Sequence, residues 1–219
     1  MSRELTKLCF CVQLLCVLAC DEGLPTTVSS FEVTIENLTN GETATDFSEG
    51  VYVINREGFP LFFQQAQDFG QGLEFLAEDG IADSLFQNLQ DQTEFESGLF
   101  PSINSGSSIS FTIEGAYGDF FNFATMFLES NDLFLSFNSD GIPLFEANGD
   151  PISGDKSASA WLWDLGTEVN EQPFQGPNQA LRQNLIGAGE VERGRVDLVM
   201  DGFNYQDKFS LIRISIRPL

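Results

Sequence analysis

The stretch FNFATMFLESNDLFLSFN, residues 121–138, contains two apolar segments separated by a polar turn. In the first segment Phe121, Phe123, Thr125 and Phe127 lie on one side of a period-two pattern, which is typical of a β-strand. Residues 133–137 form a second strand candidate, and the polar residues between the two segments favour a turn. The stretch therefore predicts a pair of aromatic strands. The chain has 22 phenylalanines, which can supply a sizeable core.

Similar apolar segments occur along most of the chain, separated by Asn-Gly, Asp-Gly and Gly-Asp turns. The further strands that we predict are residues 31–38, 51–54, 108–115, 158–163, 195–200 and 209–219. One segment differs, because residues 72–92 place apolar side chains at three- and four-residue spacing, as one or two short helices interrupted near Gly80 would. Many short strands and one helical excursion predict a mainly β fold, a β-sandwich with a short helical insertion.

The first twenty residues, MSRELTKLCFCVQLLCVLAC, place Arg3 and Lys7 before an apolar run, as secretory signal peptides do. The run is shorter than the ~20 residues that a stable transmembrane helix needs. Its end, residues 17–20, resembles the lipobox of bacterial lipoproteins. This resemblance implies cleavage before Cys20, lipid on that cysteine and anchoring in the bacterial cell envelope, on its periplasmic or cell-surface face. An ordinary secretory signal is the alternative.

Composition excludes several classes of function. The chain has 33 acidic and 10 basic residues and a net charge of -23, so nucleic acid is not an expected partner. It contains no histidine, which removes Ser-His-Asp and Cys-His catalysis and the usual zinc and iron sites. Its four cysteines all lie in the leader, so the remaining chain is expected to fold without disulfides. A pair of carboxylates could still hydrolyse glycosides, which keeps a hydrolase as a minor alternative.

Oxygen-bearing side chains gather beside two predicted strand ends. They are Glu129, Asn131 and Asp132 in one stretch, and Asp164 and Glu168 around a Gly-Thr turn in another. Carboxylate and amide oxygens are the ligands of hard cations, above all Ca²⁺. Neither stretch has the spacing of an EF-hand. The residues themselves therefore leave two interpretations open, a calcium site or acids that accept backbone N–H bonds in turns.

Two tryptophans, Trp161 and Trp163, come directly before the second acidic stretch. Strand alternation places both on one face, and we expect both to pack in the core.

Four segments follow, in order, the pattern of the spondin amino-terminal domain family. They are FEVTIENLTNG (31–41), LEFLAEDG (73–80), TMFLESNDLFLSFN (125–138) and WDLGTEVNEQP (163–173). The resemblance covers the chain from Phe31 to the closing strand. Its most specific parts are Asp132-x-Phe134 and the turn from Asp164 to Glu168. It implies an antiparallel β-sandwich similar to C2 domains, with a calcium ion near the loops at one end.

Roles carried over from the resemblance make Asp132 and Asp164 the first calcium ligands, with Glu168 next and Glu129 as a weaker candidate. The chain departs from the family at Leu133, where a tryptophan often stands, and at Leu165, where alanine is common. Eukaryotic members of the family serve cell adhesion and matrix contact.

The expected organisation is a lipoprotein signal peptide over residues 1–19, a lipid-anchored tether over 20–29 and a spondin-like domain over 30–219. The expected function is a non-catalytic binding or adhesion module of the cell envelope. A calcium-stabilised loop rim would contact an unidentified protein or glycan, and lipid at Cys20 would contact the membrane. A structural envelope protein that needs no metal is the main alternative.

Overall fold

The computed structural model describes residues 28–56, 59–67, 72–92 and 95–219. The predicted signal peptide, the predicted lipidation site Cys20 and most of the predicted tether lie outside these residues. The first strand begins at Ser29, next to the predicted domain start at residue 30. In the described part of the chain, no helix is both long and apolar enough to cross a membrane.

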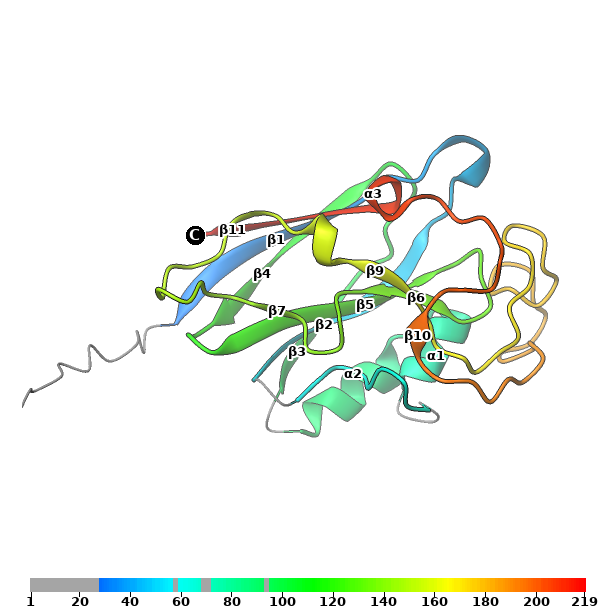
Figure 1. Ribbon diagram of the computed structural model, residues 1–219, viewed down its shortest axis with the longest axis horizontal. Helices are drawn as coiled ribbons and strands as arrows, with labels where there is room; N and C mark the ends of the chain where they lie inside the picture. Colours follow the sequence, from blue (N-terminus) through cyan, green and yellow to red (C-terminus); the bar gives the residue numbers. More distant parts are fainter. Residues whose placement is uncertain (1–27, 57–58, 68–71, 93–94) are drawn as a thin grey trace, which may run out of the picture.

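Two antiparallel sheets pack face to face (Figure 1). Among the described residues, the first sheet has four strands in the order β4-β1-β11-β8, with bounds Ser108–Gly115, Ser29–Asn37, Ile212–Pro218 and Gly154–Asp155. The second sheet has seven strands, six of them in the order β10-β9-β6-β5-β2-β3. Their bounds, in that order, are Asp197–Leu198, Trp161–Asp164, Leu133–Ser136, Asp119–Phe127, Phe47–Arg56 and Phe95–Phe100. The seventh strand, β7 (Ile142–Pro143), pairs with β5. The predicted mainly β, antiparallel sandwich is confirmed.

The core between the sheets follows from period-two alternation along the strands. On β1, Phe31, Val33 and Ile35 are fully buried, whereas Glu32 and Glu36 on the other face are partly exposed. The second sheet contributes a set of buried aromatic rings that meet edge to face or stacked, namely Phe121, Phe123 and Phe137. Burying each such side chain contributes about 1.5 to 3 kcal/mol, so these rings stabilise the packing of the two sheets together with the aliphatic side chains around them.

Two short helices cover the outer face of the second sheet and form a third layer (Figure 1). They are α1, Leu73–Asp79, and α2, Asp83–Gln90. Gly80 ends α1 in the left-handed conformation, with φ of 71°, and its N–H donates to the carbonyl of Leu76. The prediction of one or two short helices interrupted near Gly80 is therefore confirmed, and the structure has two.

Some strand predictions were wrong in extent. Residues 208–211 form a helical turn, α3 (Lys208–Leu211), because the Asp207 side chain accepts the N–H of Phe209 and caps it. The last strand therefore begins at Ile212. The predicted strand 158–163 begins only at Trp161, because residues 157–159 form a 3₁₀ turn. Of the predicted strand 195–200, only Asp197–Leu198 pair in a sheet. Another 3₁₀ turn spans residues 41–43.

The two tryptophans differ in environment. Trp163 is buried against Phe62 and Phe134, and its indole N–H donates to the carbonyl of Phe137 at 2.8 Å. Trp161 is 37% exposed, and the Lys208 ammonium lies over its ring. The prediction that both pack in the core was therefore wrong for Trp161. The ammonium group of Lys208 therefore covers one face of this ring.

Long connections between β9 and β11 gather at one end of the sandwich. Figure 1 shows residues 165–196, in yellow and orange, at the end of the molecule away from the C-terminus. The turn between β5 and β6, residues 128–132, lies at this end because the two strands are antiparallel neighbours and β6 pairs with β9. Both predicted acidic stretches therefore meet there.

Candidate functional site

Strand pairing brings the two leading candidate ligands together. β6 and β9 are adjacent and antiparallel, and Leu133 lies opposite Asp164. Asp132 comes directly before β6 and Asp164 is the last residue of β9. The ladder continues one step further, since the N–H of Leu165 donates to the carbonyl of Asp132 at 3.2 Å. Two aspartates far apart in the sequence are thus neighbours at one end of the sheet.

Asp132 is fully buried, and its two carboxylate oxygens have different surroundings. Oδ2 accepts the backbone N–H groups of Thr167 at 2.7 Å and Glu168 at 3.1 Å, and the Thr167 hydroxyl at 3.3 Å. Oδ1 is buried without a hydrogen-bond partner. The positive φ of Gly166, 74°, turns the chain so that these N–H groups point at the carboxylate. The loop after β9 therefore wraps around Asp132.

Asp164 is partly buried and is also held by its own loop. Its Oδ1 accepts the N–H of Gly166 at 2.8 Å, and its Oδ2 accepts the Asn170 side-chain amide at 2.7 Å. It lines an open pocket of about 410 Å³ together with Glu192 and Asp197. Asp164 thus lies between the buried Asp132 and the surface.

The electrostatics of this aspartate pair are unfavourable for two negative charges. Burial is the largest cause that raises the pKa of Asp132, and repulsion from Asp164 raises it further, against the hydrogen bonds from Glu168 and Thr167. Burial likewise raises the pKa of Asp164, against the hydrogen bonds from Gly166 and Asn170. Neither carboxylate forms an ion pair with a basic side chain of the described residues. The pair needs a proton or a cation.

Glu168 is buried but faces a different pocket from Asp164. Its Oε1 accepts the N–H of Gly189 at 2.8 Å, and its Oε2 is buried close to the backbone of Gly189. Burial raises the pKa of Glu168 to about 7, opposed by hydrogen bonding to Gly189 and Asn131. It lines a pocket with Glu78 and Asp79 of α1.

Across the described ranges, no three acidic, cysteine or histidine side chains lie close enough to hold one metal ion. The structure therefore brings Asp132 and Asp164 together as a pair and does not gather all four predicted ligands around one point.

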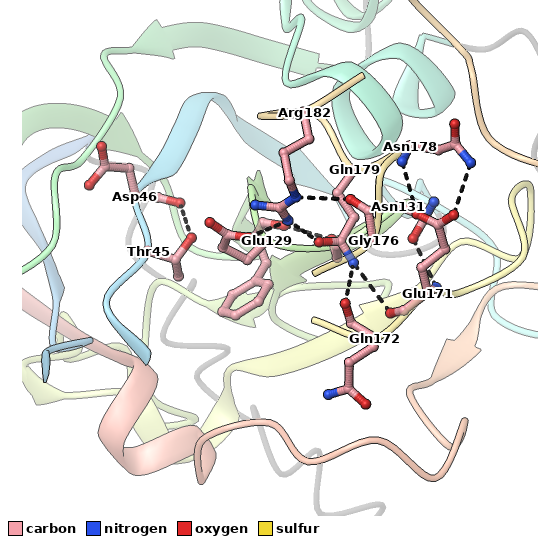
Figure 2. A network of polar contacts seen from close by, with 12 residues as sticks. Thr45, Asp46, Glu129, Asn131, Glu171, Gln172, Gly176, Asn178, Gln179 and Arg182 are labelled. Carbon is pink, nitrogen blue, oxygen red and sulfur yellow. Dashed lines mark hydrogen bonds and ion pairs between the residues drawn. The ribbon is translucent and has the colours of Figure 1, made fainter. Parts of the chain in front are cut away.

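Glu129, the fourth predicted ligand, has a basic partner. Its Oε2 lies 2.5 Å from Nη2 of Arg182; the Glu129 side chain is largely buried and that of Arg182 is partly exposed. Arg182 also donates through Nε to the carbonyl of Gly176 at 2.9 Å and through Nη2 to the side chain of Gln179. Figure 2 shows this arginine between Glu129 and the loop. The charge of Glu129 is thus neutralised within the chain, in contrast to Asp132.

A second part of the same network joins the two acidic stretches (Figure 2). The N–H of Glu171 donates to Oδ1 of Asn131 at 2.9 Å. The Glu171 carboxylate accepts the backbone N–H and the side-chain amide of Asn178, at 3.0 and 2.9 Å. Gln179, fully buried, donates to the carbonyls of Glu171 and Gln172. The loop after β9 is therefore folded back on the β5–β6 turn by side-chain amides.

Sequence reasoning missed Glu78, Asp79 and Arg182. The sequence contained one signal for Glu78 and Asp79. Acidic residues in the last turn of a helix interact unfavourably with the helix dipole, so a compensating partner is expected near them. Burial raises the pKa of Glu78 to about 7, with repulsion from Glu168 among the smaller causes. Arg182 lies in a segment without periodicity, so nothing in the local pattern marks it.

A scan against models of known protein families finds no match for this chain, and a search of curated proteins finds no significant match either.

Proposed function

We propose that this chain is an exported, lipid-anchored and non-catalytic binding module of spondin type, in which Asp132 and Asp164 hold a calcium ion that stabilises the acidic loops. The observation that carries the proposal is the unpartnered, fully buried Oδ1 of Asp132 beside a second carboxylate. Burying a charge without a partner is costly, so a buried carboxylate of this kind normally has a cation or a proton.

The donor set fits calcium. Carboxylate oxygens of Asp132 and Asp164 are hard ligands, and amide, carbonyl and water oxygens would complete the coordination of a calcium ion. Bound calcium would neutralise the repulsion between the two aspartates. We leave Glu129 out of the proposed ligand set because Arg182 already neutralises it, and Glu168 because it lines the neighbouring pocket.

The chain's own residues explain how the ion would affect binding. Asp132 accepts hydrogen bonds from the backbone N–H groups of Thr167 and Glu168, and Asn131 accepts one from that of Glu171. The loop after β9 and the β5–β6 turn are therefore already joined. Neutralising the repulsion between Asp132 and Asp164 would hold the loop and the turn in one conformation. A preorganised loop surface binds a protein or glycan at a lower entropic cost.

A structural envelope protein that needs no metal is the second candidate. It is favoured by the raised pKa of Asp132, because a proton on the unpartnered oxygen would also remove the charge. A carboxylate hydrolase has less support. Its two acids must reach the substrate, whereas Asp132 is fully buried and Glu168 nearly so.

Thermal unfolding of the full chain, in detergent solution, separates the two candidates. The midpoint is measured in chelator and across a calcium titration, for the parent and for Asp132→Asn. At a calcium concentration of 100 times Kd the parent should gain about 2.7 kcal/mol, a rise of roughly 5 to 10 °C. The variant should not respond, while the matched control Glu129→Gln should respond like the parent. No rise in the parent at millimolar calcium would favour the structural protein.

A further inference from the structure

Among the described residues, strand β4 (Ser108–Gly115) is one edge of the four-stranded sheet, and its outer side carries unused hydrogen-bonding groups. In an antiparallel pair, alternate residues of each strand bond to the partner strand. The register of β1 and β4 continues to Asn37, whose N–H donates to the carbonyl of Ser107 at 2.9 Å, so the odd-numbered residues of β4 bond to β1. The even-numbered residues therefore direct their backbone N–H and C=O groups away from the sheet. They are Ser108, Ser110, Thr112 and Glu114.

The edge formed by β4 lacks the features that usually protect such a strand. Within the described chain, no backbone hydrogen bond joins its four outward residues to another strand or loop, and all four are exposed. The strand is eight residues long, it contains no proline or lysine, and its register with β1 has no bulge. At the opposite edge of the sheet, β8 has only two residues. A long and regular edge such as β4 is a template for pairing with another strand.

The outer face of this sheet is close to neutral, whereas the whole chain has a net charge of -23. Glu32 of β1 pairs with Arg217 of β11 at 3.1 Å. Glu36 pairs with Arg213 of the same strand at 2.8 Å. On β4 itself the one charged residue is Glu114. A second copy of this acidic chain therefore meets less repulsion at β4 than the net charge suggests.

The sequence of β4 is complementary to itself when two copies pair antiparallel about Phe111. This register places Ser110 of one copy opposite Thr112 of the other, so that hydroxyl groups meet. It also places Ser108 opposite Glu114, so that no glutamate faces a glutamate. All four outward residues then lie opposite outward residues of the other copy, and their backbone N–H and C=O groups can bond to one another.

We infer that β4 pairs edge to edge with β4 of a second copy of this chain, and that the two four-stranded sheets thereby join into one continuous sheet. The unprotected edge supplies the hydrogen bonds, and the self-complementary register and balanced charges favour a second copy over a different chain. The inference is independent of the proposed calcium site, because β4 contains none of the proposed ligands.

Sedimentation equilibrium of the full chain, in density-matched detergent, tests the pairing. The parent should form a dimer whose fraction rises with protein concentration. Thr112→Pro removes an outward N–H from each copy and no bond to β1, because proline is tolerated at such an edge position. It should weaken dimerisation at least about tenfold. The matched control Thr112→Val keeps the N–H and should dimerise as the parent does. Circular dichroism checks that both variants are folded.

A pair of charge variants tests the register, whether or not Thr112→Pro folds. Ser110→Glu with Thr112→Glu brings like charges opposite each other across the two copies, and Ser110→Glu with Thr112→Lys brings opposite charges together. In about 0.15 M salt, which screens repulsion beyond about 8 Å, the first should be monomeric where the parent is dimeric. The second should dimerise at least as strongly as the parent.

A parent that stays monomeric at every concentration would overturn the inference, since the edge would then be open to a different chain. A dimer that a folded Thr112→Pro retains, or that both charge variants retain equally, would also overturn it, because the copies would then meet at another surface.

Discussion

The backbone N–H of Thr167 donates a 2.7 Å hydrogen bond to Oδ2 of Asp132, across 35 positions of sequence. This bond joins the loop after β9 to the turn before β6. It also leaves Oδ1 of the same carboxylate buried without a partner. A single aspartate is thus both the anchor of the loop and a buried carboxyl with an unpartnered oxygen, which is why we propose that a calcium ion binds there.

Stability should fall as the pH rises from about 4.5 to about 7. Burial raises the pKa of Glu78 and of Glu168 from 4.5 to about 7. Below the lower value both folded and unfolded chains carry the protons; between the two values only the folded chain holds them, so raising the pH favours unfolding. Each group should cost on the order of 2 to 3 kcal/mol by pH 8.

Urea unfolding in chelator at pH 5 and at pH 8 measures this loss. Glu78→Gln should be less sensitive to pH than the parent, because glutamine does not titrate. A parent that is equally stable or more stable at pH 8 would show that these two carboxyls are ionised at little cost.

The ion pair between Glu129 and Arg182 should contribute to stability. Arg182→Met removes the partner of a largely buried carboxylate and the anchors to Gly176 and Gln179, and we expect it to cost about 3 to 5 kcal/mol. In a double-mutant cycle with Glu129→Gln, followed by urea unfolding, the coupling energy should be about 1 to 3 kcal/mol. Additive effects of the two substitutions would mean that the pair is not a stabilising interaction.

Gly189→Ala should destabilise the loop through one named contact. A Cβ atom at this position would overlap the carboxylate of Glu168, which the Gly189 N–H also binds. We expect a loss of about 1 to 3 kcal/mol in the free energy of unfolding. In the Glu168→Ala background the same glycine substitution should cost much less. An equal cost in both backgrounds would assign the effect to something other than this overlap.

Terbium should bind the proposed calcium site and emit when tryptophan is excited. The chain has two tryptophans, and Trp163 directly precedes Asp164 at the end of β9. Trp163→Phe should therefore remove most of the sensitised emission, and Trp161→Phe should remove less. Calcium should displace terbium and lower the signal. Emission that resists calcium, or that persists in Asp132→Asn, would locate the ion elsewhere.

The sequence predicted the strands whose two faces differ most. The alternation of Phe31, Val33 and Ile35 with glutamates identifies β1 because one face is buried and the other is not. The strand β3 was missed, since FESGLF does not alternate and its Gly98 is needed where Tyr52 packs. The capped turn at Asp207 was also missed, although an aspartate before a short apolar stretch is a readable helix start.

The candidate site was predicted in part for similar reasons. Asp132 and Asp164 could be found because each adjoins an apolar strand directly, and neighbouring strands bring their ends together. The roles of Arg182 and Asp79 could not be predicted from the sequence, because each depends on contacts with a segment more than fifty positions away. The same tertiary contacts decide that Glu129 has a basic partner and Asp132 does not, a difference that their sequence neighbourhood does not contain.

Isothermal titration of calcium into the full chain, for the parent and for Asp132→Asn, tests the central claim most directly. The account predicts one calcium site in the parent and none in the variant, with Glu129→Gln binding as the parent does. Absence of calcium binding to the parent, or binding that Asp132→Asn leaves unchanged, would contradict it.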